Sequence, residues 1–137
     1  MRITLEADYA VRITYALMEN GGTISARNIA ETSGITLRFA LKILRKLSQG
    51  GIVDSTKGAA GGYRLNIDPD ALPLGRIIEC IDGPFGITHC MEDDFDCTRV
   101  EHKAVCQFHH TFSEITEKIR DEFYAIKMGD YRQPPTE

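Results

Sequence analysis

Glycines occur at intervals along the first half of the sequence, and their spacing limits the folds that this chain can adopt. Apolar residues recur at helical spacing up to Gly21-Gly22, up to Gly34 and up to Gly50-Gly51, so each site predicts the end of a helix. Two segments with alternating apolar residues then flank the sequence GAAGG, which predicts a hairpin with a glycine-rich tip. Three helices and a hairpin, with a glycine turn between the second and third helices, predict a winged helix-turn-helix.

Each predicted helix starts at a hydroxyl residue that can cap it. Thr4 is placed to cap the first helix, Ser25 the second and Thr36 the third. Ser25 has a further possible role, because the backbone amides at a helix N-terminus can hold a phosphate group.

The third predicted helix, LRFALKILRKLSQ, has two chemically distinct faces. Its basic face carries Arg38, Lys42 and Arg45. An ordinary solvated surface would also explain these three cations, but the hairpin that follows favours DNA binding. In a winged helix this helix enters the major groove, and the tip of the hairpin approaches the backbone or the minor groove. The apolar face is predicted to comprise Leu37, Ala40, Leu41, Leu44 and Leu47. The predicted DNA-contacting residues are Ser25, Thr36, Arg38, Phe39, Lys42, Arg45, Lys57, Gly61 and Tyr63.

Charge is distributed unevenly along the chain. Residues 1–67 carry nine Lys and Arg against five Asp and Glu, a net charge of +4, whereas residues 68–137 carry seven against fifteen, a net charge of −8. This asymmetry indicates a basic module that binds a polyanion and an acidic module with another role.

The acidic half contains a stretch rich in metal-binding side chains. Residues 90–110 hold three of the four cysteines and three of the four histidines. Six residues separate Cys90 from Cys97 and eight separate Cys97 from Cys106, whereas zinc sites usually bring ligands in closely spaced pairs. Three widely spaced thiolates favour an iron-sulfur cluster, because its corners are well separated. The alternatives are a redox-sensing dithiol, a zinc site closed by Cys106 and His109, and buried apolar cysteines.

The remaining segments predict a connector, a loop and a long helix. A short helix is expected from Leu74 to Asp82, where Cys80 is expected to be a buried, inert thiol. The chain is expected to divide into a DNA-binding domain (1–67), a connector and cluster loop (68–98), a helix (99–128) and a disordered tail (129–137). An apolar stripe on the long helix predicts pairing with a second copy, and a dimer would read a palindromic operator. The stripe comprises Val105, Phe108, Phe112, Ile115, Ile119, Phe123 and Ile126.

Several classes of protein are disfavoured. No apolar run reaches the length of a membrane span and no targeting segment is present, so a cytoplasmic protein is expected. The sequence has no G-x-S-x-G, phosphate loop or dinucleotide fingerprint, so an enzyme is not expected. A small iron-sulfur electron carrier is a further alternative, but it would leave the helix-turn-helix and the wing without a role.

Five parts of the sequence together resemble the IscR-type winged-helix transcription regulators, whose relatives include NsrR, RirA and CymR proteins. These parts are the opening MRITLEADYAVR, the segment SGITLRFALKILRKL, the wing KGAAGGYRLN, the connector LGRIIECIDG and the three cysteines ahead of the last helix. The resemblance implies a homodimeric repressor or activator. Its 2Fe-2S or 4Fe-4S cluster would report iron status, redox state or nitric oxide.

The resemblance also implies a ligand set. Cys90, Cys97 and Cys106 are similar to the three cysteine ligands of the family. For the fourth ligand, His109 is similar to the histidine of IscR proteins, and Asp8 is similar to the aspartate that NsrR proteins lend from the partner subunit.

The sequence also departs from the family pattern. The gaps between the cysteines are longer than is common in the family, which leaves His102, His110 and Cys80 as alternative ligands. Leu41 occupies the position of an operator-reading glutamate of IscR, which implies a different operator preference. A cluster-free regulator similar to CymR, acting through a thiol or zinc, is the alternative within this fold.

Overall fold

Hydroxyl caps and glycines define the helices in the N-terminal half, as the sequence predicts. The computed structural model describes residues 2–134. The side chains of Thr4, Ser25 and Thr36 each accept a backbone N–H three residues further on, and Gly21 and Gly34 end helices in the left-handed conformation. The helices are α1 (Leu5–Asn20), α2 (Ala26–Ser33) and α3 (Leu37–Gln49).

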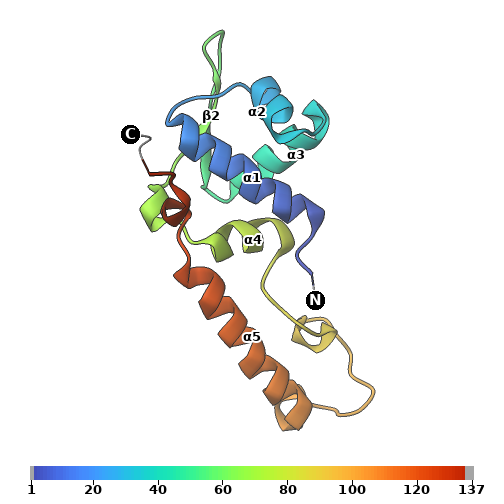
Figure 1. Ribbon diagram of the computed structural model, residues 1–137. Coiled ribbons are helices and arrows are strands. Elements are labelled where there is room, and N and C mark those ends of the chain that lie inside the picture. Colours follow the sequence, from blue (N-terminus) through green and yellow to red (C-terminus); the bar gives the residue numbers. More distant parts are fainter. Residues whose placement is uncertain (1, 135–137) are drawn as a thin grey trace.

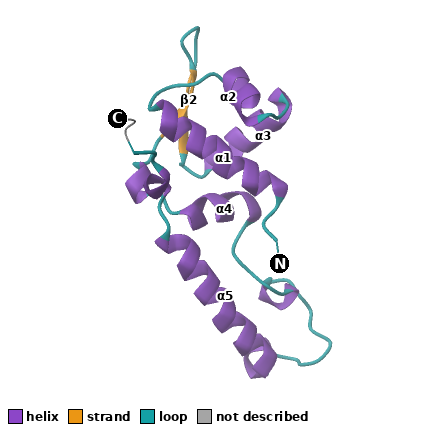
Figure 2. Cartoon of the chain, in the orientation of Figure 1, coloured by secondary structure: helices purple, strands orange, loops and turns teal. Residues whose placement is uncertain are grey.

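The wing is a two-stranded antiparallel hairpin of β1 (Val53–Thr56) and β2 (Gly62–Leu65). Val53 pairs with Leu65 at its base and Thr56 with Gly62 near its tip. Tyr63 also forms a bridge with Ile24, which fastens the wing to the segment ahead of α2. The prediction of a mainly helical winged helix-turn-helix with a small hairpin is therefore confirmed (Figures 1 and 2).

The apolar core lies where α1, α3 and α4 (Leu74–Asp82) meet. Pro73 precedes α4 and Gly83 follows it, and the helix has the predicted bounds. Gly75 is buried against the ring of Tyr124 in the last helix, so the absence of a side chain allows the two helices to approach closely. Fully buried core side chains include Ile13, Leu17, Ile29, Ile43, Leu44, Leu47, Ile52, Leu72 and Ile77.

The last helix, α5 (Gln107–Ala125), starts eight residues later than predicted. The backbone N–H of Arg99 donates to Cys97 Sγ at 3.4 Å instead of to a helical carbonyl, and Cys106 has an extended backbone. Two short 3₁₀ helices, His89–Met91 (η2) and Lys103–Val105 (η3), interrupt this loop. The residues ahead of α5 therefore wrap around the cysteines and do not extend the helix.

The C-terminal segment differs from the predicted disordered tail. After α5 the chain forms the 3₁₀ helix η4 (Met128–Tyr131), which lies against η1 (Pro69–Ala71). Met128 is buried, and Arg132 contacts the carboxylates of Asp68 and Asp70. No sequence pattern predicts this contact, because the segment is polar apart from Met128 and Tyr131. Residues 135–137 of the predicted tail lie outside the described residues, and the division into domains stays a prediction.

Helix α5 extends away from the winged part, with its C-terminal end beside α4 and its N-terminal end beside the cysteine loop (Figure 1). Thr116 is its one buried residue. On the apolar stripe, Val105, Phe108 and Ile115 are exposed, whereas Phe123 stacks on Phe85 at a centroid separation of 5.1 Å. The stripe thus contacts this chain near the base of the helix and is exposed further out.

Candidate metal centre and nucleic-acid interface

The exposed face of α3 carries three cations. Arg38 and Arg45 form no ion pair within residues 2–134, whereas Lys42 Nζ lies 3.5 Å from a carboxylate oxygen of Glu6 on α1. This face can therefore present two unpaired guanidinium groups to phosphates or base edges.

Leu41 lies on this same face, with 41% of its surface exposed, and Leu37 is similarly exposed. The prediction that both pack inward is wrong. Ile43 occupies the core instead, because the buried stripe is rotated by part of a turn from the predicted one. Leu41 is consequently an exposed apolar residue next to Arg38, Lys42 and Arg45.

Other predicted DNA-contacting residues have a local structural role. The Oγ atoms of Ser25 and Thr36 accept backbone N–H groups as helix caps. Phe39 is half-buried, with its ring edge-on to Tyr9 at 5.7 Å. Their part in DNA binding stays a prediction.

The wing places Lys57 on the exposed tip of the hairpin. At Gly61, a Cβ atom would lie 2.2 Å from the carbonyl oxygen of Thr56, so the tight turn requires glycine there. Tyr63 is half-buried and packs against the core. Of the wing residues predicted to contact DNA, Lys57 is therefore the one that extends freely from the fold.

The three cysteines of the loop and His109 line one cavity of about 390 Å³. Cys90 lies on η2, Cys97 in the loop, Cys106 directly before α5 and His109 on its first turn. His109 Nδ1 is 3.4 Å from Cys90 Sγ. Residues up to nineteen positions apart are thus brought around a common space, with Phe95, Phe108 and Phe112 among its walls.

The donors are arranged around the cavity and do not converge on one point. Within the described part of the chain, no three His, Cys, Asp or Glu side chains are grouped closely enough to hold a single metal ion. All four cysteines are free thiols. Three thiols and an imidazole are donors of the kind that bind iron-sulfur clusters and zinc.

Two of these thiols have polar partners in the loop. Thr88 Oγ1 lies 2.9 Å from Cys90 Sγ. Backbone N–H groups of Arg99 and Val100 lower the pKa of Cys97, because they stabilise its thiolate. Thr88 was not predictable from the sequence, since the loop has no periodicity that would indicate which polar side chains approach the cysteines.

The alternative ligands lie elsewhere. Cys80 packs between α4 and α3, donates to the carbonyl oxygen of Lys46 at 3.4 Å and has a pKa raised by burial. His110 Nε2 is 2.7 Å from the carbonyl oxygen of Ala104, and His102 is exposed; neither lines the cavity. Asp8 pairs with Arg12 on α1 at 2.8 Å and is not among the cavity residues of its own chain.

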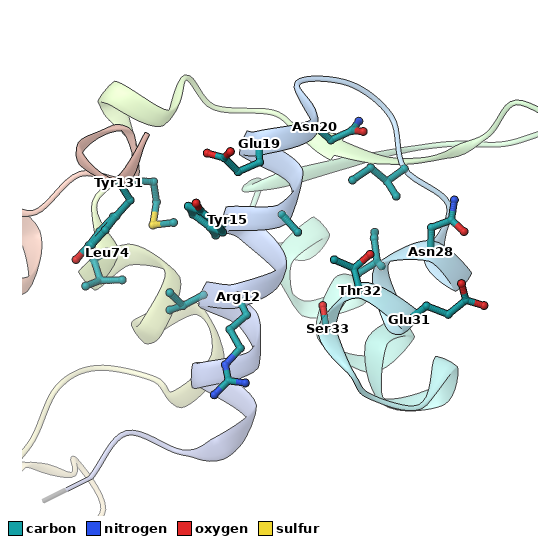
Figure 3. Close-up of a pocket in the computed structure, with 15 residues that line it drawn as sticks. Arg12, Tyr15, Glu19, Asn20, Asn28, Glu31, Thr32, Ser33, Leu74 and Tyr131 are labelled. Atoms are coloured by element: carbon teal, nitrogen blue, oxygen red, sulfur yellow. The ribbon is translucent and has the colours of Figure 1, made fainter. Parts of the chain in front are cut away.

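A second, larger cavity of about 940 Å³ lies along α1, with α2 on one side and Leu74, Met128 and Tyr131 on the other (Figure 3). Its floor is mainly apolar, and Glu19 and Glu31 lie at its edges. None of the predicted site residues lines it. No sequence pattern indicated this groove, because it is formed by segments more than forty residues apart.

The fold and the basic face of α3 define a winged helix-turn-helix protein of the transcription-regulator class. Residues 3–133 match the family model described as "Rrf2: Iron-dependent Transcriptional regulator". The chain therefore belongs to the Rrf2 family, which confirms the resemblance to IscR-type regulators. None of the helices within residues 2–134 combines the length and the apolar character needed to cross a membrane.

Relatives and solved structures agree with this assignment. The HTH-type transcriptional regulator IscR of Vibrio cholerae is 30% identical over 132 residues, which cover 95% of this chain and 74% of the relative. The structure of CymR, the global cysteine regulator of B. subtilis, has a TM-score of 0.73 at 23% identity and covers 95% of both chains. T. potens IscR has a TM-score of 0.71 at 22% identity, covering 95% of this chain and 85% of that one. These two likenesses show the fold.

Proposed function

We propose that this chain is a cytoplasmic, homodimeric regulator whose affinity for a DNA operator is controlled by an iron-sulfur cluster. The observation that carries the proposal is the cavity lined by Cys90, Cys97, Cys106 and His109. It lies beside the start of α5, and the other end of α5 rests on α4, which in turn packs against α1 and α3 of the winged part. The family description, which names iron, supports the same function.

The chain's own residues supply the ligand set. Cys90, Cys97 and Cys106 would bind as thiolates, with His109 as the fourth ligand in the same chain. Asp8 of the partner subunit is the alternative fourth ligand. A bound 2Fe-2S or 4Fe-4S cluster would hold these residues together, and its presence would depend on iron supply, redox state or nitric oxide.

The loop residues can transmit the state of this site. Cys106 adjoins the first residue of α5, and the segment from Phe85 joins the cavity to the end of α4. When the thiolates and His109 are held together, the loop and the start of α5 are held in one arrangement. When they are released, the loop can take others, and such two-state coupling is typically worth about 1–3 kcal/mol.

Dimerisation would use the exposed part of the α5 stripe. Phe108 and Ile115 lie on the same side of α5 and are 60% and 40% exposed, and the guanidinium group of Arg99 lies over the ring of Phe108. A second copy paired there would place two α3 helices on one DNA duplex, so that a palindromic operator is read by Arg38, Lys42 and Arg45 of each copy.

The first test is the absorption spectrum, with iron and sulfide content, of protein purified without oxygen. Visible bands with roughly two or four irons per chain are expected. Cys90→Ala, Cys97→Ala and Cys106→Ala should each lose them, whereas Cys80→Ala is the matched control and should keep them. His109→Ala and Asp8→Ala decide the fourth ligand.

The second part of the test is DNA binding by cluster-loaded and cluster-free protein at one salt concentration. Different affinities for a selected operator are expected. Equal affinities on every operator selected from genomic fragments would overturn control by the cluster while leaving DNA binding intact.

A thiol-based regulator of the same fold is a second candidate. It is favoured by Cys97, a half-buried thiol whose sulfur accepts the backbone N–H of Arg99. A colourless protein without iron after anaerobic purification and attempted reconstitution, whose DNA affinity changes on mild oxidation, would support this candidate. A protein with a cluster but only weak binding to DNA, without sequence preference, would instead indicate an electron carrier.

A further inference from the structure

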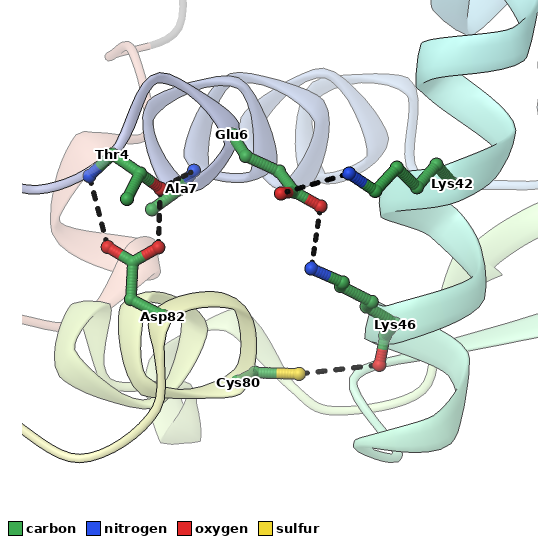
Figure 4. A network of polar contacts seen from close by, with 7 residues as sticks. All are labelled: Thr4, Glu6, Ala7, Lys42, Lys46, Cys80 and Asp82. Carbon is green, nitrogen blue, oxygen red and sulfur yellow. Dashed lines mark hydrogen bonds and ion pairs between the residues drawn. The ribbon is translucent and has the colours of Figure 1, made fainter.

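The carboxylate of Glu6 lies between two lysines of the recognition helix α3 (Figure 4). Glu6 Oε2 is 3.5 Å from Lys42 Nζ and Oε1 is 2.8 Å from Lys46 Nζ. The side chain of Glu6 is only 19% exposed. These ammonium groups, Lys46 first, lower the pKa of Glu6, so it is ionised at neutral pH.

The two lysines are one helical turn apart on α3 and would repel each other without a carboxylate between them. Lys42 also belongs to the exposed face that carries Arg38 and Arg45, and its side chain is 60% exposed. It is therefore the one cation of this face that already has an anionic partner within residues 2–134. A DNA phosphate would have to compete with Glu6 for Lys42.

Hydrogen bonds connect the first turn of α1, which carries Glu6, to the root of the cysteine loop, meaning Asp82 at the end of α4. Glu6 lies on the first turn of α1, which Thr4 caps. The backbone N–H of Thr4 donates to Asp82 Oδ2 at 3.0 Å, and its hydroxyl donates to Asp82 Oδ1. Asp82 is the last residue of α4, and the loop that carries the cysteines follows directly after it (Figure 4). A shift of this root would move Thr4, and with it the turn that carries Glu6.

We propose that Glu6 is an intramolecular competitor of DNA phosphate, which limits the contact of Lys42 and Lys46 with DNA, and that Asp82 sets its position through Thr4. The inference rests on the proposed DNA-binding function and names a regulatory contact within that same surface. Release of Glu6 would add a phosphate contact without any new residue reaching the DNA.

The test measures the salt dependence of binding to one random-sequence duplex, so it requires neither the operator nor a cluster. Glu6→Gln should bind more tightly than the unmodified chain, and its log–log salt slope should be steeper by about 0.9 for each lysine released. With one lysine released, its advantage should fall about 3.5-fold between 50 and 200 mM salt. Glu19→Gln is the matched control, since it removes the same charge from an exposed position of α1.

Two outcomes would overturn the competition. One is a Glu6→Gln slope equal to that of Glu19→Gln. The other is an effect of Glu6→Gln that persists when Lys42 and Lys46 are both glutamine. If instead no variant binds the duplex, or Arg38→Gln and Arg45→Gln leave binding unchanged, the proposed DNA-binding function itself fails.

A second comparison does not depend on the stability of the Glu6 variant. Lys42→Gln should reduce duplex affinity less than Arg45→Gln, because Lys42 has to leave Glu6 before it binds a phosphate. Equal losses would contradict the competition.

A separate experiment tests the role of Asp82. Asp82→Asn should shift the salt slope in the same direction as Glu6→Gln but by less, and the two changes together should match Glu6→Gln alone. Asp121→Asn, at an exposed position of α5, is the control. Identical slopes for Asp82→Asn and Asp121→Asn would show that Asp82 does not position Glu6.

Discussion

Glu79 shows how one residue can join three parts of this molecule. It lies on α4 and accepts hydrogen bonds from Arg120 Nε at 2.9 Å and from the Tyr124 hydroxyl at 2.5 Å, both on α5. It also accepts the backbone N–H of Phe85, at the start of the loop, at 3.3 Å. Burial raises the pKa of Glu79, but the donors of Arg120, Tyr124 and Phe85 outweigh it, so the pKa lies below its usual 4.5.

The first residue-scale prediction concerns this carboxylate and pH. Because its pKa is lowered on folding, Glu79 contributes stability that is present above pH 4.5 and is lost as pH falls through the lowered value. Glu79→Gln should reduce the free energy of unfolding by about 1–3 kcal/mol at neutral pH. Urea unfolding across pH measures this, and the deficit should shrink below pH 4.5. Glu19→Gln should show no such deficit, and a deficit independent of pH would contradict the assignment.

The residue scale is where the sequence was least informative. The caps Thr4, Ser25 and Thr36 were predictable, since a cap depends on neighbours in the chain. The side-chain contacts of Glu79 and Glu6 were not, because the partners on α5 and α3 lie more than thirty residues away and no local pattern pairs them. The inward placement of Leu41 failed for a related reason: helical periodicity locates the apolar stripe to within part of a turn, and the packing of α1 and α4 decides the rest.

At the scale of elements, the ends of a helix could be predicted where proline or glycine residues mark them. Helix α4 matched its expected bounds because Pro73 and Gly83 mark its two ends. No such marker precedes α5. The apolar period continues back through Val105 and predicts an earlier start, whereas the loop that wraps the cysteines delays the helix to Gln107. The shared cavity of the cysteines and His109 agrees with the predicted grouping, although the ligand roles stay predictions.

The element-scale prediction concerns the exposed stripe of α5. Ile115→Lys should shift the proposed dimer towards monomer, because an ammonium group would have to be desolvated in the apolar contact. Sedimentation equilibrium measures the change. Glu117→Lys places the same side chain on the opposite, exposed side of α5 and should leave the dimer intact. A dimer unaffected by Ile115→Lys would place the dimer contact elsewhere.

For the whole molecule, the C-terminal segment returns to the winged part and fastens the base of α5. Lys127 forms a bridge with Pro73, the N–H of Met128 donates to the carbonyl oxygen of Leu72 at 2.9 Å, and Met128 itself is buried. Met128 is therefore part of the core that α1, α3 and α4 form, which no composition-based division of the sequence would predict.

The corresponding prediction is that Met128→Ala destabilises the whole protein by about 2–5 kcal/mol, as expected for a large core side chain replaced by a small one. Met128→Leu conserves volume and should cost less than about 1.5 kcal/mol. Urea unfolding followed by helix content provides both values. A loss confined to residues 126–134, with the rest of the transition unchanged, would contradict a shared core.

The anchored base gives α5 the mechanics of a lever arm. Its nineteen residues span about 28 Å at the usual helical rise. A pivot of about 10° at the base would therefore sweep the outer tip through roughly 5 Å, given that length. A displacement of a few ångströms at the tip thus corresponds to a rotation of only a few degrees at the base. The thiol end can move far while the other end turns only slightly.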